Sequence, residues 1–452
     1  MRVLVVVHRF PPDSMGGTEL YALRLAQHLA ARRDQVSVLT YAEGDTREVV
    51  ARDQEYRGIP VRRLSFDLDQ TSNPVLEEYD NRRVAVYLKG ALAASRPDLV
   101  HIAHFGYLSA SVLATANDLG IPSVVTLTDF WPICVTSRLV RGDGSLCSGP
   151  TDLGQCARCY TKMGSRGDRY SQLARLVPTL VWRMGTAACE LPIVRGLPYA
   201  RWLNALAGRK RVIRQRLLGA KAIFCPGAFV REVLVRNGYP PDRIRLSPHG
   251  IADPERLGGA TRVGGGPVLR FGYVGPLAQY KGAHLPVEAF TSGDSELLAT
   301  LTYWGALGAA STRDAYAASV MRRIAEAPGV SHQGPYANDA VKEVMESLDV
   351  LIVPSTWYEN TPTVIYEALA SGTPVIATDQ GGMRELVLEH RGGWLFPRGD
   401  VHALASLMKS LVENPEIVRR VAQGIRPVPS FAAHFREVSL VYKQILSREG
   451  VP

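Results

Sequence analysis

Short apolar runs alternate with helix-like stretches along most of this chain, and that alternation restricts its fold more than any other feature. Residues 3–7 read VLVVV, a continuous β-branched run typical of a strand buried on both faces of a parallel sheet. A glycine-containing turn and an amphipathic helix at 18–33 follow. Further strands are predicted at 36–40, 99–103, 122–128 and 221–225. Strands that alternate with helices predict a doubly wound α/β sheet.

The alternation begins again after a linker. Residues 254–267 contain seven glycines and prolines in fourteen positions. A chain of 452 residues is long enough for two or three domains. We therefore predict one α/β domain at 1–253, a second at 254–427 and a closing helix at 428–452. Strands of the second domain are expected at 269–275, 297–304, 349–355, 373–379 and 394–397. Ligands should bind at the carboxyl ends of the strands, in a cleft where the two domains face each other.

Residues from about 141 to 218 do not fit the alternation, and we treat this basic stretch as an insertion in the first domain. From Arg158 to Lys221 the chain has fourteen Lys or Arg and two acidic residues. Nucleic acid, plain solvent and an anionic membrane would each suit such charge. Trp182, Trp202 and several leucines interleave with the arginines, as in interfacial membrane segments, and no nucleic-acid reader motif is present. We favour a membrane surface and expect no nucleic-acid partner.

The N-terminal apolar run covers only five residues before His8, which is too short for an export signal or a bilayer span. We expect a cytoplasmic protein. Because the basic segment favours an anionic membrane, we also expect peripheral binding at the inner face of the cell membrane. In a reducing cytosol the six cysteines would be free thiols or metal ligands rather than disulfides.

Residues 355–382 contain the most informative motif of the chain. After the strand at 349–355, a helix is predicted to start near Thr361, with Asn360 or Thr361 as N-cap and Pro362 in the first turn. The backbone amides of Thr363 and Val364 would then form an anion site at the helix N-terminus.

Two glutamates flank that anion site. Glu359 stands just before the helix, and Glu367 lies eight positions later in its second turn. A carboxylate at the mouth of an anion site suits a ligand that also carries sugar hydroxyls. The alternative is that Glu359 caps the helix and Glu367 lies on a solvated face.

Residues 355–382 resemble the Glu-x7-Glu signature of the retaining GT-B glycosyltransferases of family four. The resemblance implies two Rossmann-like domains, with a nucleotide diphosphate sugar donor mainly in the second. It implies a saccharide or lipid-linked acceptor in the first. On this resemblance Glu359 lies by the transferred sugar, with Asn360, Thr361, Thr363 and Val364 beside it, and Glu367 binds the donor ribose.

Three further segments resemble family motifs in the expected order. PPDSMGGTEL resembles the N-terminal glycine loop, which implies that Gly16 and Gly17 approach the donor phosphates. YVGPLAQYKG resembles the Gly-Arg-Leu-x3-Lys-Gly segment, which implies that Lys281 binds the diphosphate. LSPHGIA resembles the turn before the second domain, with His249 where Asn is frequent.

The chain departs from the family pattern at two positions. Pro276 replaces the Arg of the second segment, so another cation must bind the diphosphate, and Arg384 and Arg9 are the candidates. VVTLTDFW resembles a segment that usually reads Thr-Leu-His-Asp, so Thr128 replaces the acceptor-side His. Asp129 is kept and could orient or deprotonate the acceptor hydroxyl. His104 could approach it from the preceding strand or be a structural histidine.

Four cysteines cluster in and before the insertion, at Cys134, Cys147, Cys156 and Cys159. The CxxC pair has the spacing of zinc ligands, and a structural zinc held by four thiolates would stabilise a segment with little core. Reduced thiols are the equal alternative. Cys189 and Cys225 are interpreted as core residues.

The predicted function is transfer of a hexose-type sugar in glycan or polysaccharide biosynthesis, with Asp129, Lys281 and Glu359 as the catalytic set. By family resemblance the anomeric configuration is retained, through front-face displacement in which the leaving phosphate helps to deprotonate the acceptor. No cofactor or catalytic metal is expected. Two alternatives are a nucleotide-sugar epimerase of the same architecture and a non-catalytic nucleotide-sugar-binding partner.

Overall fold

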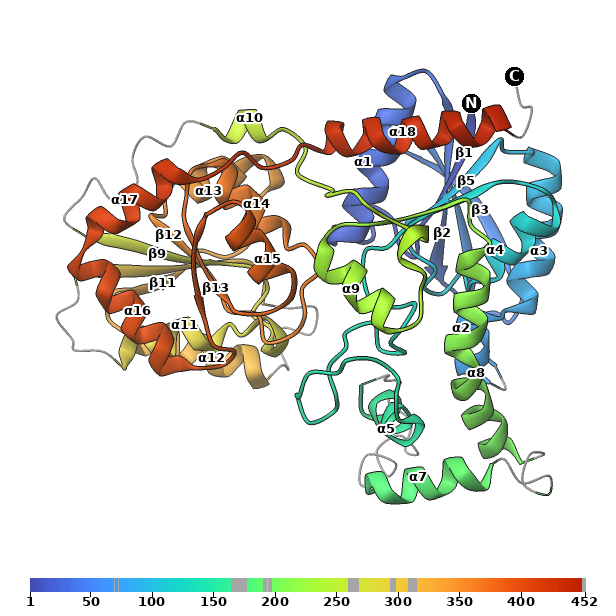
Figure 1. The fold of residues 1–452 in the computed structure, drawn as a ribbon, viewed down its shortest axis with the longest axis horizontal. Helices are drawn as coiled ribbons and strands as arrows, with labels where there is room; N and C mark the ends of the chain where they lie inside the picture. Colours follow the sequence, from blue (N-terminus) through green and yellow to red (C-terminus); the bar gives the residue numbers. More distant parts are fainter. Residues whose placement is uncertain are drawn as a thin grey trace. The chain divides into compact units, whose positions relative to one another are not determined.

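The computed structural model describes residues 1–68, 70–71, 73–163, 177–189, 193, 197–258, 268–292, 298–307 and 315–448. The chain forms two compact units (Figure 1). The first unit is Met1–Ser247 with Ala432–Pro452, and the second is Pro248–Phe431.

The two units divide at 247/248, six residues before the predicted boundary at 253/254, and the closing helix belongs to the first unit. Ile251 explains the earlier boundary, because it is buried in a core cluster of the second unit. The backbone around it is also bound there. Ile251 N–H donates to the carbonyl of Pro429 at 3.2 Å, and Phe431 N–H donates to the carbonyl of Ile251 at 2.7 Å.

The first unit is built on an eight-stranded sheet with the order β3-β4-β2-β1-β5-β6-β7-β8. Only the β3/β4 pair is antiparallel; the other pairs are parallel. The strands are β1 (Arg2–Val6), β2 (Gln35–Glu43), β3 (Val50–Tyr56), β4 (Ile59–Phe66), β5 (Leu99–Ile102), β6 (Ser123–Thr126), β7 (Ala222–Cys225) and β8 (Ile244–Leu246).

The hairpin of β3 and β4 was not predicted. β3 is exposed at six of its seven positions, so it has no apolar alternation to detect. The turn between them uses Arg57 and Gly58, both with positive φ (51° and 77°), and Arg57 occupies a position where Asn or Asp is the usual signal.

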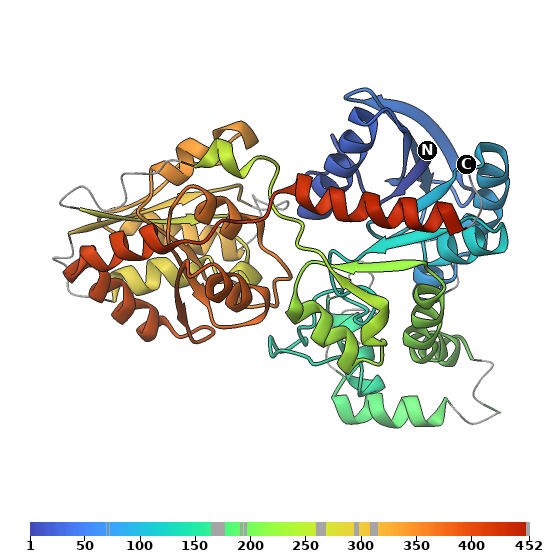
Figure 2. The same ribbon diagram turned by 45° about the horizontal axis from the view of Figure 1, so that its top comes forward.

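The helices of the first unit are α1 (Gly17–Ala31), α2 (Pro74–Tyr79), α3 (Arg82–Ser95), α4 (Ser111–Asp118), α5 (Leu153–Met163), α7 (Thr179–Ala188), α8 (Pro198–Leu218), α9 (Ala228–Arg236) and α18 (Phe431–Arg448). Most of them pack around this sheet, but α5 and α7 lie away from it (Figures 1 and 2). The predicted insertion lies between β6 and β7 and contains α5, α7 and α8. Its last helix also serves as the crossover that two parallel strands require.

Helix α18 is attached to the first unit by a buried polar network. His101 Nδ1 contacts the Tyr442 hydroxyl at 2.5 Å, and His101 Nε2 contacts Thr126 Oγ1 at 2.9 Å. The Tyr21 hydroxyl donates to Thr126 Oγ1 and lies 3.0 Å from His434 Nε2. Burial lowers the pKa of His101 to about 3 and that of His434 to about 4, so both rings are neutral near pH 7.

The second unit is built on a six-stranded, all-parallel sheet with the order β11-β10-β9-β12-β13-β14. One of its two central strands, β12 (Val350–Val353), is buried on both faces. The side chain of Ile352 belongs to one core cluster, and those of its neighbours Leu351 and Val353 belong to another. The strands are β9 (Leu269–Val274), β10 (Ala299–Trp304), β11 (Val330–His332), β12 (Val350–Val353), β13 (Val375–Thr378) and β14 (Gly393–Phe396).

The helices of the second unit are α10 (Pro254–Leu257), α11 (His284–Thr291), α12 (Ala315–Glu326), α13 (Val341–Glu346), α14 (Thr363–Ala370), α15 (Gly381–Glu389), α16 (Val401–Glu413) and α17 (Pro415–Gly424). The predicted doubly wound α/β class is confirmed for both units. In the part of the chain that the structure describes, no helix combines the length and apolarity needed to span a bilayer.

Candidate functional site

The candidate site of the second unit is the loop between β12 and α14, at the carboxyl edge of the sheet. Helix α14 begins at Thr363, with Pro362 as a N-cap that makes no side-chain bond, so the prediction of Asn360 or Thr361 as N-cap was wrong. The backbone of Pro362 is itself extended (φ −67°, ψ 113°), so the helix begins after the proline rather than with it. Thr363 and Val364 still form the first turn, where backbone N–H groups precede the intrahelical bonds.

Glu359 lies in this loop and is only 8% exposed. One of its oxygens, Oε1, accepts three hydrogen bonds: from Lys281 Nζ at 2.7 Å, from Trp357 Nε1 at 2.7 Å and from Ser355 Oγ at 2.8 Å. Burial acts to raise the pKa of Glu359, but the Lys281 charge and these hydrogen bonds outweigh it and lower the pKa. Glu359 is therefore a fixed carboxylate paired with Lys281, whose predicted role at the donor diphosphate stays a prediction.

A second loop, between β9 and α11, delivers Lys281. Thr356 N–H donates to the Tyr280 carbonyl at 2.9 Å and joins the two loops, and the Tyr280 and Trp357 rings lie 4.7 Å apart. Gly282 ends this segment with φ of 67°, and a Cβ there would lie 2.1 Å from the Pro354 carbonyl oxygen. Only glycine allows this approach, which keeps Lys281 beside Glu359.

The N-terminus of α15 is hydrogen-bonded to the loop that carries Glu359. Gln380 Nε2 donates to the carbonyls of Ser355 and Trp357 at 2.9 and 2.7 Å. Gly382 N–H donates to the Glu359 carbonyl at 2.9 Å, and a Cβ on Gly382 would lie 1.8 Å from the Asn360 carbonyl oxygen. The sequence did not identify Gln380 or Trp357 as partners of this loop.

Asn360 has an unusual environment beside the start of α14. Both polar atoms of its side chain are buried, and neither has a hydrogen-bond partner among the described residues. Such orphaned groups are rare and call for an explanation, such as a ligand or a water. Farther along α14, Glu367 is half-buried. Its charge acts on Tyr336, whose pKa is raised mainly by burial and secondly by Glu367.

The structure places the remaining donor-side candidates less centrally. Arg384, a candidate replacement for the missing arginine, pairs with Asp379 and is about half exposed. Arg398, which sequence analysis did not single out, donates from Nε to the Thr356 carbonyl at 2.6 Å and brings a cation to the loop. His249 lies half-buried between β8 and α10.

In the first unit, the predicted glycine loop leads into α1, with Gly16 as N-cap and Gly17 as the first helical residue. The neighbouring carboxylate of Glu19, only 5% exposed, was not anticipated. It accepts a hydrogen bond from Ser14 Oγ at 2.6 Å and lies 3.6 Å from His8 Nε2. The role of Gly16 and Gly17 at a phosphate stays a prediction, and a buried carboxylate nearby would oppose an anion there.

Asp129 follows β6, and His104 follows the neighbouring strand β5. His104 Nδ1 accepts the Gly106 N–H at 2.8 Å, so in the neutral ring Nε2 carries the proton and donates to Asp129 Oδ2 at 2.9 Å. Asp129 Oδ1 accepts the Trp131 N–H at 2.9 Å. Thr128 donates instead to the Ala103 carbonyl at 3.2 Å. The histidine beside Asp129 thus comes from β5.

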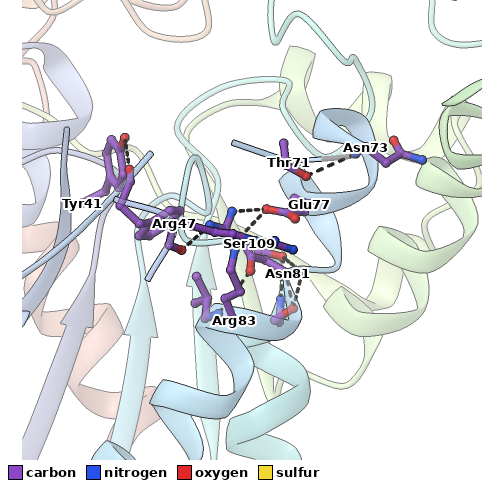
Figure 3. Close-up of polar contacts among 11 residues, drawn as sticks. Tyr41, Arg47, Thr71, Asn73, Glu77, Asn81, Arg83 and Ser109 are labelled. Atoms are coloured by element: carbon purple, nitrogen blue, oxygen red, sulfur yellow. Dashed lines mark hydrogen bonds and ion pairs between the residues drawn. The ribbon is translucent and has the colours of Figure 1, made fainter. Parts of the chain in front are cut away.

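The β5–α4 loop that carries this histidine is conformationally unusual. Tyr107 and Ser109 both have positive φ (63° and 67°), a strained conformation for residues other than glycine. The Asn81 N–H donates to Ser109 Oγ at 3.1 Å. Figure 3 shows this contact at the start of α3, beside the Arg83–Glu77 ion pair. The start of α3 therefore holds the loop in place.

Arg9, the other candidate cation, is in the first unit and stacks on the Tyr107 ring at 5.4 Å. His8 also lies close, with its ring 4.2 Å from that of His104. Burial, followed by the charges of His104 and Arg9, holds the pKa of His8 well below its usual value. His8 is therefore a neutral neighbour of the His104–Asp129 pair near pH 7.

The cysteines Cys134, Cys147, Cys156 and Cys159 line one pocket of about 400 Å³ in the first unit. Burial, followed by the other three thiols, raises the pKa of Cys156 to about 12. Nevertheless, among the residues with described positions, no group of three or more His, Cys, Asp or Glu could hold a metal ion. The arrangement does not fit a preformed zinc site. Zinc binding stays a prediction, which metal analysis of protein purified without chelator would test.

Comparison with known families matches both halves of the chain. The family model described as Glycosyl transferase 4-like domain matches residues 16–250, just over half of the chain. The model described as Glycosyl transferases group 1 matches residues 269–414. These two ranges contain Asp129 and the Lys281–Glu359 pair, respectively.

Individual relatives agree with these matches. The 2-deoxystreptamine N-acetyl-D-glucosaminyltransferase of Streptomyces fradiae is 27% identical over 428 residues, which cover 92% of this chain and 87% of that protein. The amylovoran biosynthesis glycosyltransferase AmsK of Erwinia amylovora is 25% identical over 254 residues, covering 52% of this chain and 60% of that protein.

Sucrose-phosphate synthase from Thermosynechococcus elongatus superimposes with a TM-score of 0.64 at 16% identity, over 99% of each chain. HepE from Anabaena, solved with UDP, gives a TM-score of 0.60 at 15% identity over the whole of each chain. These structural likenesses show the GT-B fold. Together with the family matches, they show that this chain belongs to the family-four glycosyltransferases.

Proposed function

We propose that this protein is a retaining hexosyltransferase that uses a nucleotide diphosphate sugar as donor. The observation that carries the proposal is the Lys281–Glu359 pair beside the N-terminus of α14. An ammonium and the amides of Thr363 and Val364 would stabilise a departing diphosphate, and a fixed carboxylate can accept sugar hydroxyls. The orphaned amide of Asn360 supports a ligand at this edge, because a donor group would satisfy it.

The reaction transfers a glycosyl group. The bond between the anomeric carbon and the diphosphate oxygen breaks, and the acceptor oxygen bonds to the same face of that carbon. The acceptor proton goes to the departing phosphate, so no covalent intermediate on the protein is needed. In this scheme Lys281 neutralises charge on the leaving group, and Glu359 orients the sugar. Asp129 orients the acceptor hydroxyl.

The donor can be identified by thermal shift with UDP, GDP, ADP and their sugars. HepE was solved with UDP-glucose, so the UDP series is tested first. We expect one base to stabilise the protein, and Glu367→Ala to weaken that binding by roughly tenfold as its ribose hydrogen bonds are lost. Glu343→Ala, an exposed glutamate on α13, is the matched control. If no nucleotide stabilised the protein, the proposal would fail.

The retaining outcome needs its own measurement. Once the donor is known, proton NMR of the first product formed distinguishes the two anomers before they equilibrate. We expect the product to keep the anomeric configuration of the donor sugar. An inverted product would leave the glycosyltransferase assignment intact and overturn the retaining mechanism.

We further propose a saccharide or lipid-linked acceptor, presented at the cytoplasmic face of a membrane, in glycan or polysaccharide biosynthesis. The support comes from relatives such as the amylovoran biosynthesis glycosyltransferase and the aminocyclitol glycosyltransferase of Streptomyces fradiae. One relative is named for the biosynthesis of amylovoran and the other for 2-deoxystreptamine, so lipid-linked saccharides and free 2-deoxystreptamine should be tested side by side as acceptors. Transfer to the free acceptor alone would remove the lipid-linked part of the proposal.

One observation keeps a non-catalytic alternative in view. Pro276 and Thr128 stand where the family has a phosphate-binding Arg and an acceptor-side His. Tight nucleotide-sugar binding with neither hydrolysis nor transfer would favour a binding partner over an enzyme. Release of an altered nucleotide sugar without acceptor would instead identify an epimerase.

A further inference from the structure

Helix α7 of the insertion has two different faces. Trp182 points inward and is only 4% exposed, whereas Leu180, Val181 and Met184 are 65%, 52% and 65% exposed. Leu180 and Val181 precede Met184 by four and three residues, the spacings that place side chains on one side of a helix, so these three side chains form a single surface. We call Leu180, Val181 and Met184 the α7 face. A soluble helix normally turns such a face toward a core.

Exposed apolar residues concentrate in helix α7 and in the residues that follow it. Leu197 and Ile193 are also exposed, at 55% and 90%. Five of the fourteen large apolar side chains that are exposed in the described residues therefore fall between 180 and 197. The other nine are spread over the rest of the chain, as is normal for single surface positions. A cluster of this kind marks an interaction site.

The α7 face is presented on a firm support. The rings of Trp182 and Trp202 lie 6.0 Å apart, and Trp202 lies 5.7 Å from Tyr160, so aromatic contacts join α7, α8 and α5. Arg183 pairs with Asp152 at 2.6 Å. Figures 1 and 2 both show α7 at the end of α5 and α8 that is farthest from the sheet of the first unit. The exposed side chains therefore belong to a packed helix.

Charge identifies the partner. The segment from Arg158 to Lys221 carries fourteen basic and two acidic residues, a net charge of +12. In a symmetric dimer two copies of this segment would meet, and their like charges would repel. An anionic bilayer matches both features, because its headgroups attract cations and its acyl boundary accepts apolar side chains. Arg201 is exposed on the first turns of α8, four residues after Leu197.

We propose that the α7 face docks this protein on anionic lipid bilayers, with Leu180, Val181 and Met184 at the acyl boundary and the exposed Arg201 among the headgroups. The inference rests on the proposed function in one respect, because the proposed acceptor is what selects the cytoplasmic face of the membrane. It assigns the membrane contact to one helix surface, which composition alone did not do.

The test is co-sedimentation of the full chain with phosphatidylcholine vesicles, with and without phosphatidylglycerol. We expect binding only to the anionic vesicles, and its loss at high salt. Leu180→Asn with Met184→Asn should lower the partition coefficient by roughly tenfold, since two apolar contacts are lost. Val86→Asn with Leu440→Asn is the matched control, because both residues are exposed elsewhere in the first unit. Arg201→Glu should weaken binding to the anionic vesicles.

Three results would overturn the proposal: equal pelleting with neutral and anionic vesicles, equal loss in the control pair, or unchanged pelleting of the α7 variant. If the α7 variant instead dissociated a dimer in size-exclusion chromatography without changing pelleting, a second copy would be the partner. Nucleotide thermal shifts on the same variants separate the two proposals, because the α7 face can fail as an anchor while the donor still binds.

Discussion

Each unit places one candidate carboxylate at the edge of its sheet, and the two are held differently. Glu359 is buried, and three donors, one of them the Lys281 ammonium, converge on a single oxygen. The Asp129 side chain is 31% exposed and receives one donor on each oxygen, from His104 and from the Trp131 backbone. Glu359 is thus built as a fixed charge. Asp129 keeps a side open to solvent, where an acceptor hydroxyl can bind.

The first way to break this contrast is to remove the cation. Lys281→Met should lower kcat by roughly 100- to 1000-fold, because the departing diphosphate loses a preorganised positive group. Turnover of the identified donor measures the effect. Lys342→Met, on α13 of the same unit, is the matched control because this lysine lies at the surface and pairs with the exposed Glu346. Turnover unchanged from the wild type would mean that Lys281 serves only to anchor Glu359.

Neutralising Asp129 tests whether its solvent-exposed side binds the acceptor hydroxyl. Asp129→Asn keeps the shape of the side chain and should lower transfer by roughly 100-fold, the range for a lost general base or orienting group. The nucleotide thermal shift should stay unchanged, since donor and acceptor groups are distinct. His104→Gln, which can still donate a hydrogen bond, should retain more activity than His104→Leu. If the two His104 variants behaved alike, the bond to Asp129 would have no positioning role.

Acid should weaken the first unit before the second. In the unfolded chain a histidine binds a proton near pH 6.5, but buried His101 and His434 resist protonation to about 3 and about 4. The unfolded state therefore binds more protons below about pH 6.5, and the unfolding free energy falls by about 1.4 kcal/mol per pH unit for each histidine. The Glu359 pKa is also lowered, but that contribution persists until the pH falls below the usual glutamate range.

Calorimetry between about pH 7 and pH 4.5 can follow this difference, with limited proteolysis to assign each transition to a unit. His101→Gln should flatten the pH dependence of the first unit, whereas His402→Gln, at an exposed position on α16, should leave it unchanged. Simultaneous loss of both units over this range would show that the buried histidines do not set the acid limit.

The smallest expected effect concerns glycines at two helix starts. Gly382→Ala would push a Cβ against the Asn360 carbonyl, so we expect about 1–3 kcal/mol of destabilisation. A Cβ on Gly17 would meet nothing within 4 Å, so Gly17→Ala should be neutral or stabilising by up to about 1 kcal/mol. Denaturant unfolding measures both. Equal effects would mean that the tight backbone approach at Gly382 can relax.

The sequence predicted the parts of the fold that rest on apolar periodicity. The strands at 99–103 and 373–379 appear as β5 and β13 with small shifts at the ends, because a buried parallel strand is a continuous apolar run. The antiparallel β3 has no such run and was missed. The boundary between the units was misplaced because the Gly/Pro-rich stretch is conspicuous, whereas the single buried side chain of Ile251 is not.

Motifs in the sequence name Lys281 and Glu359 separately, and the structure brings these two side chains together. Their roles at a donor stay predictions, and the residues that surround them were not anticipated. Ser355 and Trp357 donate to Glu359 from the same loop, and Gln380 at the start of α15 donates to the carbonyls of both, but no motif names these three residues. Likewise, His104 reaches Asp129 because β5 and β6 are neighbours in the sheet, although the residues are 25 positions apart.

The attachment of α18 to the first unit bears on how the protein is made. Because its Tyr442 closes the buried contact with His101, the first unit cannot finish its core until the last helix has left the ribosome. The second unit lies in the sequence between the two segments that form the first unit, so it can fold before the first unit is complete. A released chain truncated after Phe431 should resist protease in the second unit and remain cleavable in the first.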